Sequence, residues 1–204
     1  MSVTLEQLLE SRDNRAQHQK DLLGKNPGKS LLCLTVQLPG SVKRSADSLA
    51  IAQAGVEAIR QAFSPEYEEL KDLETGYEAF FLVSMPPLEA KRKTCQIEDS
   101  HPLGRLMDID VLTVIPGTDC ASAGAHGIGK NIFRDGTRKT IFPEAIANPT
   151  HADAVPVGRE EIGLPQRRCL LCGAPVRVCM RARTHSSAEL LDKIHEMVKI
   201  YLNL

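Results

Sequence analysis

Tryptophan is absent from this chain of 204 residues, and aromatic residues make up only 4% of it. So few aromatic side chains offer little as a stacking platform for single-stranded nucleic acid. The formal net charge is −1, so the chain has no bulk electrostatic attraction toward nucleic acid either. The composition therefore argues against nucleic acid as a partner.

Long hydrophobic runs are also missing, and no stretch is long enough to cross a bilayer. The chain begins with acidic and polar helix formers rather than with the basic and apolar regions of a secretory signal. We therefore expect a cytoplasmic protein without a membrane partner. In that compartment the six cysteines should be reduced thiols that fill the core, bind metal or act as nucleophiles.

Hydrophobic residues make up 42% of the chain and charged residues 25%, which is ordinary for a soluble globular protein. The patterns predict strands at 30–38, 77–83 and 108–114, helices at 5–23, 45–63 and 87–99, and a final helix that begins at Ser186 or Ser187. Because strands alternate with helices, we predict one α/β (α+β) domain over residues 1–204, with a mixed sheet flanked by helices.

The first predicted helix begins with a capping box formed by Thr4 and Gln7. Three residues suggest a core face at its start: Leu5, Leu8 and Leu9. Residues 11–20 are almost entirely polar, and a helix that is polar on every side is either solvated or lines a site. Arg12 and Arg15 share a face within it, so they either pair with acidic neighbours in solvent or line a site.

The most informative stretch covers residues 101–112 and contains Asp-Ile-Asp-Val. On a strand, Asp108 and Asp110 point to one side while the intervening apolar residues point into a core. Two like charges on one face repel unless a cation lies between them, and Mg²⁺ takes carboxylates, water and substrate phosphates. The alternative is a solvated strand face, because Asp-x-Asp pairs are common.

A turn marked by Pro102 and Gly104 precedes this strand. The turn carries His101 and Arg105 close to the acidic pair. Arginine suits phosphate because its planar fork binds two oxygens at once. This short stretch therefore offers a metal site and an anion clamp together.

Residues 115–163 are rich in glycine and proline and predict a long loop or insertion, which in a compact domain is functional or disordered. Residues 124–130 nearly spell a phosphate loop, but Asn131 replaces the Ser or Thr that would contact magnesium. No clear strand leads into this segment, so a mobile glycine-rich lid is the alternative.

The segment 165–204 combines cysteines with arginines ahead of the final helix. Cys169, Cys172, Cys179 and His185 are compatible with a Cys3His zinc site. The alternative is small buried thiols beside the start of a basic helix. Five arginines make the stretch basic: Arg167, Arg168, Arg177, Arg181 and Arg183.

Three motifs occur together in one order: Ser-Arg-Asp-x-Arg at 11–15, His-Pro-Leu-Gly-Arg-Leu-x-Asp-Ile-Asp-Val at 101–111, and Arg-Cys-Leu-x-Cys…Cys-x-Arg…Thr-His at 168–185. Together they resemble the apo-citrate lyase phosphoribosyl-dephospho-CoA transferases, also called holo-acyl-carrier-protein synthases of citrate lyase. The resemblance covers the segments around 5–115 and 165–200. The glycine-rich segment looks longer than the family's usual connection.

The resemblance implies a transferase that moves phosphoribosyl-dephospho-CoA from triphosphoribosyl-dephospho-CoA to a serine of the apo acyl carrier subunit of citrate lyase, with release of pyrophosphate. This is nucleotidyl transfer, which requires positioning and charge neutralisation more than covalent chemistry. The strand that carries Asp108 and Asp110 would then be a nucleotidyltransferase-like active strand. Both carboxylates would hold Mg²⁺, and one of them could receive the serine proton.

The resemblance also implies roles for other residues. Arg105, beside Gly104, and Arg12 and Arg15 would bind the triphosphate, and His101 would bind phosphate or shuttle a proton. The arginines at 167, 168 and 181 would face an acidic carrier. Two alternatives stay open, a zinc-stabilised non-catalytic adaptor for an acidic partner and a nucleotide hydrolase that uses residues 124–130.

Overall fold

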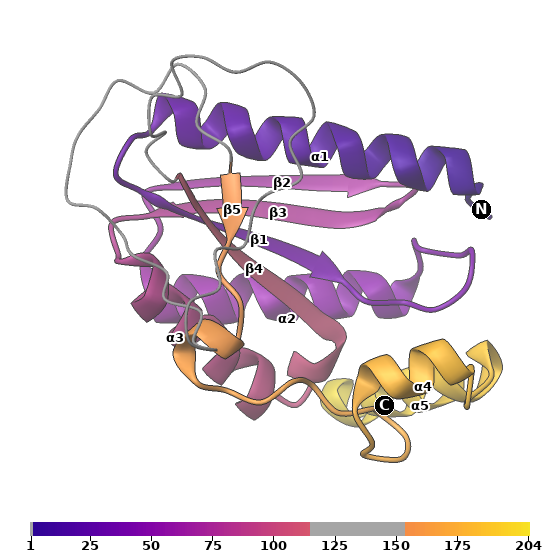
Figure 1. The fold of residues 1–204 in the computed structure, drawn as a ribbon. Helices are drawn as coiled ribbons and strands as arrows, with labels where there is room; N and C mark the ends of the chain where they lie inside the picture. The colour runs from indigo at the N-terminus through magenta and orange to yellow at the C-terminus, as the bar shows by residue number, and fades with distance from the viewer. Residues whose placement is uncertain (1, 115–153) are drawn as a thin grey trace, which may run out of the picture.

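The structure, a computed structural model, describes residues 2–114 and 154–204. Its described strands form one sheet in the order β2-β3-β1-β4-β5 (Figure 1). Their bounds are β1 Ser30–Val36, β2 Tyr67–Leu73, β3 Gly76–Val83, β4 Met107–Val114 and β5 Ala154–Pro156. This arrangement confirms the predicted α/β class.

Helices cover both faces of the sheet. Their bounds are α1 Leu5–Lys25, α2 Ala46–Phe63, α3 Pro87–Ser100, α4 Val176–Ala182 and α5 Ser187–Leu202, with 3₁₀ turns at Gly104–Leu106 and Glu160–Ile162. Helix α1 lies on one face and α2 on the other, while α4 and α5 lie together at one end of the molecule (Figure 1). The predicted capping box of Thr4 and Gln7 is present, and Ser186 caps α5. None of the described helices is long and apolar enough to cross a membrane.

Every described pairing in the sheet is antiparallel, whereas the sequence predicts a mixed sheet. The difference arises from β2, which the apolar patterns do not predict because Tyr-Glu-Glu-Leu-Lys-Asp-Leu is highly charged. This strand forms a hairpin with β3 and so turns β3 antiparallel to β1. Charged residues suit an edge strand, because they discourage pairing with other chains.

The core is divided by the sheet into two unequal parts. The larger part packs α2, α3 and α5 on one face and includes Leu34, Ile51, Ile59, Phe81, Ile109, Val111 and Ile194. The smaller part lies under the C-terminal half of α1 and includes Leu22, Leu23, Leu31, Phe80 and Leu112. The predicted core face at the start of α1 is wrong. Leu5 and Leu9 are 73% and 45% exposed, Leu8 is only half-buried, and none of the three belongs to either described part of the core.

The predicted loop at 115–163 is only partly within the described residues. Its end contains β5, which pairs with β4, and a 3₁₀ turn at Glu160–Ile162. The phosphate-loop-like residues 124–130 and Asn131 lie outside the described residues.

Candidate active site and metal cluster

Strand β4 carries Asp108 and Asp110 on the sheet face that α1 covers. Leu112, at the next alternate position, belongs to the small core under α1, which fixes the side to which all three point. Ile109 and Val111 are fully buried in the larger core on the opposite face. The alternation predicted from the sequence therefore holds along the strand.

Asp108 lies at the end of a row of polar residues that crosses four strands. In this row Asp108 pairs with Thr35, Thr35 pairs with Glu78, and Glu78 pairs with Lys71. Neighbouring strands are about 4.8 Å apart, so the backbone of Lys71 lies about 14 Å from that of Asp108. The two ends of the row are open to solvent to different degrees, and its middle is covered, because Glu78 is only 6% exposed.

Asp108 is held from two sides. Arg167 Nη2 lies 3.1 Å from its Oδ1, and Gln37 Nε2 donates to its Oδ2 at 2.9 Å. The Asp108 side chain is 34% exposed, so substrate can still reach it. The cation that the two aspartates require is thus partly supplied by Arg167.

Asp110 has a different environment. It makes no hydrogen bond or ion pair with any residue in the described part of the chain, and its side chain reaches solvent. Surrounding protein displaces much of the water near the carboxylate, and this desolvation, followed by the charge of Asp108, raises the pKa of Asp110. The two carboxylates are therefore chemically distinct, one anchored and one available.

Side chains take the place of a neighbouring strand along part of β4. Strand β5 pairs only with residues 112–114, which leaves the outer edge open further back. There Arg167 donates to the carbonyl of Met107 at 3.2 Å, Glu98 accepts from the amide of Ile109 at 2.9 Å, and Lys91 donates to its carbonyl at 3.1 Å. These bonds satisfy the open edge and hold the strand that carries the acidic pair.

Glu98 is the centre of this edge network and is only 2% exposed. It is paired with Arg167 and with Arg159, whose Nη1 lies 3.1 Å from its Oε2. Sequence patterns give no sign of Glu98 or Lys91, because a charged residue on an amphipathic helix is usually solvated. Only the packing of α3 against β4 reveals them.

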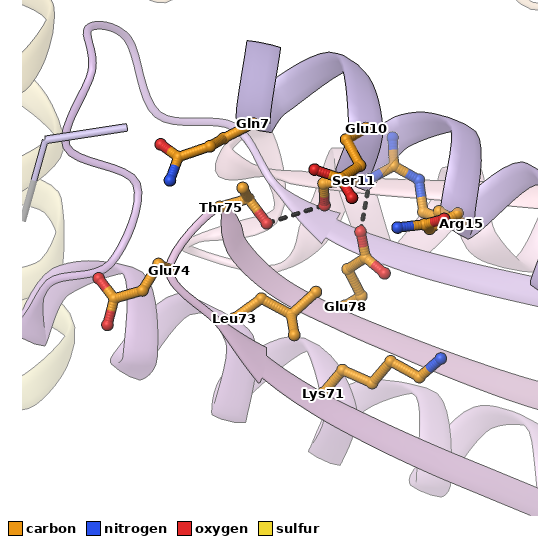
Figure 2. A pocket seen from close by; sticks show the side chains of 10 residues that line it. Gln7, Glu10, Ser11, Arg15, Lys71, Leu73, Glu74, Thr75 and Glu78 are labelled. Atoms are coloured by element: carbon orange, nitrogen blue, oxygen red, sulfur yellow. Dashed lines mark hydrogen bonds and ion pairs between the residues drawn. The ribbon is translucent and has the colours of Figure 1, made fainter. Parts of the chain in front are cut away.

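A polar cavity of about 370 Å³ lies between the N-terminal half of α1 and the β2–β3 hairpin (Figure 2). Arg15 and Ser11 extend into it from α1, where Arg15 Nη1 donates to Glu78 Oε1 at 2.7 Å. Glu78 and Lys71 line the cavity and also belong to the Asp108 row. The cavity and the acidic pair are therefore connected by a row of polar residues whose middle α1 covers.

Arg12 and Arg15 have different positions despite their spacing. Arg12 is exposed and lies 3.6 Å from the carboxylate of Asp13, which is the solvated arrangement. Only Arg15 lines the cavity.

The turn before β4 is not brought against the acidic pair. His101 packs against the ring of Tyr201 at a centroid distance of 5.4 Å, and its burial lowers its pKa. Arg105 donates to the carbonyl of Arg168. Within the described residues neither side chain forms a hydrogen bond or ion pair with the aspartates.

Gly104 has a packing role in this turn. A Cβ atom at this position would lie 2.5 Å from the carbonyl oxygen of Ile97 and 2.6 Å from that of Glu98. Backbone atoms cannot yield as a flexible side chain can. Glycine is therefore required for the close approach of the turn to α3.

The predicted zinc ligands come together in space. The ligand atoms of Cys169, Cys172, Cys179 and His185 all lie within 4.8 Å of one another, and the Cys172 and Cys179 sulfurs are 3.4 Å apart. In a tetrahedral zinc site, ligand atoms about 2.3 Å from the ion are about 3.8 Å from each other. The group could therefore hold a metal ion such as zinc.

The electrostatics of the cluster favour the same interpretation. Hydrogen bonding with His185, and then with the backbone of Ala174, lowers the pKa of Cys172 to about 6. For Cys179, the hydrogen bond with Cys172 raises the pKa to about 11. Nε2 of His185 is buried and makes no hydrogen bond of standard geometry with a described residue. A buried ring nitrogen without a partner is costly unless a ligand satisfies it.

The predicted carrier-facing arginines are divided between two settings. Arg181 is exposed on α4, as are Arg177 and Arg183 nearby. Arg168 instead donates to the carbonyl of Gly173 at 3.3 Å, within the cysteine turn.

Comparison with known proteins gives a consistent result. The family model described as apo-citrate lyase phosphoribosyl-dephospho-CoA transferase matches residues 3–124 and 149–201. A protein of Vibrio cholerae serotype O1 (strain M66-2) is 32% identical over 98% of this chain and 94% of its own length. A protein of Streptococcus pyogenes serotype M18 is 28% identical over 99% of this chain and 88% of its own length. Both carry the name "Probable apo-citrate lyase phosphoribosyl-dephospho-CoA transferase".

Proposed function

Because the chain belongs to the apo-citrate lyase phosphoribosyl-dephospho-CoA transferase family, we propose that it attaches this prosthetic group to the acyl carrier subunit of citrate lyase. The donor is triphosphoribosyl-dephospho-CoA and the acceptor is a serine of the apo carrier. The observation that carries the proposal is the pair Asp108 and Asp110 on the polar face of β4, with one carboxylate anchored and the other available.

The reaction is a nucleotidyl-type transfer. The serine oxygen bonds to the phosphorus nearest the ribose, the bond from that phosphorus to the next bridging oxygen breaks, and pyrophosphate leaves. The serine proton passes to Asp110, the carboxylate of the pair that makes no hydrogen bond with a described residue. Asp108, fixed by Arg167 and Gln37, keeps its orientation beside it.

Magnesium is the proposed cofactor. The residues fit it, because Mg²⁺ commonly binds through one or two carboxylates plus substrate phosphates and water. Asp108 and Asp110 would hold the ion, which when bound would neutralise charge on the phosphates.

The cavity beside α1 is the proposed site for the distal part of the donor. Arg15 and Lys71 line it together with Glu10, Glu74 and Glu78, so the cavity offers hydrogen-bonding groups of both charges and suits a polar part of the donor rather than its phosphates. The exposed arginines of α4, Arg181 among them, are suited to meet an acidic carrier, because complementary charge speeds encounter. Arg105 and His101 have no role in this proposal, because their contacts lie elsewhere.

Zinc is the proposed occupant of the Cys3His cluster. Three thiolates and one imidazole form a soft, closed donor set typical of structural zinc. No described cysteine forms a disulfide, so the three sulfurs of the cluster are available to a metal ion. The same cluster is what favours the second candidate function, a zinc-stabilised adaptor that binds an acidic partner without catalysis.

Intact-mass measurement of the carrier tests the proposal. We expect apo carrier incubated with this protein, Mg²⁺ and triphosphoribosyl-dephospho-CoA to gain the mass of phosphoribosyl-dephospho-CoA. The gain should vanish with a folded Asp108→Asn variant and persist with Asp192→Asn, a matched change at an exposed position on α5. Transfer by folded Asp108→Asn would refute the role of the acidic pair. No transfer by wild type to a competent carrier would favour the adaptor.

A further inference from the structure

The cysteine turn is connected to the acidic pair through two adjacent residues. Arg167 and Arg168 immediately precede Cys169, the first ligand of the cluster. Both contact the start of β4 or the turn before it. A change in the cluster therefore has a short physical route to Asp108.

Backbone hydrogen bonds hold this turn in one shape. The amide of Cys169 donates to the carbonyl of Ala174 at 2.6 Å, and the amide of Gly173 donates to the carbonyl of Cys169 at 3.3 Å. Gly173 has φ of +70°, a conformation that side chains disfavour. Beyond the turn, Arg168 bridges Pro175, and the amide of Val176 donates to the carbonyl of Arg167 at 3.0 Å. The backbone of Arg167 is thus fixed by the same pairing that shapes the cluster.

From this fixed backbone, the Arg167 side chain reaches three groups. It pairs with Asp108 at 3.1 Å, donates to the carbonyl of Met107 at 3.2 Å and pairs with buried Glu98. Arg168 adds a second connection, because its carbonyl accepts a bond from Arg105. Both residues therefore fasten the cysteine turn to the segment that begins β4.

No described strand of the sheet takes the place of Arg167 at the start of β4. β5 pairs only from residue 112 onward, so no described strand covers the outer edge at Met107 and Asp108. The short turn itself has little apolar core, since among its four candidate ligands Cys172 is exposed and His185 half-buried. An ion held by the four ligands would therefore add to the few backbone hydrogen bonds that shape the turn.

We infer that a zinc-held cysteine turn positions Arg167 on Asp108, which makes Arg167 a positioning residue whose action depends on the metal. The inference rests on the proposed zinc, and its effect on transfer also rests on the proposed function. With zinc bound, Arg167 fixes the Asp108 carboxylate and closes the β4 edge. Without zinc, the turn relaxes and Asp108 loses one of its two anchors.

Hydrogen exchange of the full chain, with and without zinc, tests this inference independently of activity. Purified protein should contain about one zinc per chain. Removal of zinc with a chelator should accelerate exchange in peptides from the turn, 165–185, and also from 104–109, while peptides from β3 should not change. Absence of zinc, or unchanged exchange at 104–109 after its removal, would overturn the inference. A Cys172→Ser variant should reproduce the effect of the chelator.

Transfer kinetics supply the second test, through non-additivity. Zinc removal and Arg167→Ala should each lower kcat/KM about tenfold, and zinc removal from Arg167→Ala should cause no further loss. Arg60→Ala, which breaks an exposed ion pair between Arg60 of α2 and Glu68 of β2, should retain the full zinc dependence. Additive losses would show that zinc does not act through Arg167. If wild type transfers nothing, the proposed function fails, and the exchange experiment still decides the inference.

Discussion

The two faces of the sheet carry different kinds of side chain. Under α2 and α3, the sheet contributes side chains that are apolar and fully buried, such as Ile109 and Val111. Under α1, only the half near Leu22 and Leu23 is apolar, and the other half is the polar row that ends at Asp108. One strand, β4, supplies both kinds of surface at alternate positions.

This difference separates stability from chemistry along one strand. A buried apolar side chain contributes mainly transfer and packing energy, whereas a carboxylate that reaches solvent contributes little to stability and can meet a ligand. Adjacent positions of β4 should therefore respond to substitution in opposite ways. Stability and transfer measured on the same variants therefore test whether the two faces of the sheet differ in this way.

The largest effect is expected for Asp110→Asn. Loss of the group that receives the serine proton should lower kcat/KM for transfer about 10³-fold. The variant should remain folded, because Asp110 makes no hydrogen bond with the described residues. Steady-state transfer assays and urea unfolding measure the two effects. A large loss of stability with retained transfer would place Asp110 among structural residues.

The same variant should alter the pH dependence of stability. The pKa of Asp110 is raised in the folded state above its ordinary value of 3.8, so the folded state binds this proton more tightly than the unfolded state. Asp110 therefore lowers stability as pH rises from below 3.8 through the raised pKa. At neutral pH Asp110→Asn should be at least as stable as wild type, and this advantage should vanish at low pH. An advantage that persisted at low pH would contradict the assignment.

The neighbouring Ile109→Ala should show the opposite response. Truncation of this fully buried side chain should lower the free energy of unfolding by about 3 kcal/mol, because it removes apolar burial and leaves a cavity. Transfer per folded molecule should change little at temperatures well below unfolding. Ile109→Val serves as the graded control, with an expected loss of about 1 kcal/mol. Equal stability of all three proteins would break the comparison of the two faces.

Much of the fold follows from local patterns. The capping box at Thr4 and the alternation around Ile109 predict α1 and β4 to within two residues, and the serines at 186 and 187 predict where α5 begins. The charged strand β2 escapes such patterns, since an edge strand need not be apolar on either face. Its absence from the prediction also explains the expectation of a mixed sheet, because the β2–β3 hairpin sets the direction of β3.

The parts of the candidate site whose residues are close together in the sequence can be predicted from it. Asp108 and Asp110 share a strand, and the cysteine ligands are close in sequence, so their spacing alone indicates proximity. Arg167 and Glu98 are far apart in sequence, and only the tertiary fold pairs them. His101 and Arg105, expected close to the aspartates, contact Tyr201 of α5 and the carbonyl of Arg168 instead, and these contacts too depend on the tertiary fold.

A smaller effect is expected at the cavity under α1. Arg15→Ala should raise KM for the donor about tenfold, because it removes a hydrogen-bond donor from the cavity proposed for the distal part of the donor. Arg12→Ala should leave KM unchanged, since Arg12 pairs with Asp13 in solvent. Initial-rate measurements over a range of donor concentrations distinguish the two variants. Equal effects would show that helix α1 presents both arginines to the substrate.

The smallest effect is expected at Leu9, where sequence and structure disagree about the core. If the polar half of α1 lies over the cavity rather than over apolar packing, Leu9→Ala should change the free energy of unfolding by less than about 0.5 kcal/mol. Leu23→Ala on the same helix, which removes a fully buried side chain, is the positive control with an expected loss of about 3 kcal/mol. Urea unfolding measures both. A comparable loss for the two variants would mean that α1 packs on apolar residues along its whole length. The sheet face beneath the N-terminal half of α1 would then not be polar.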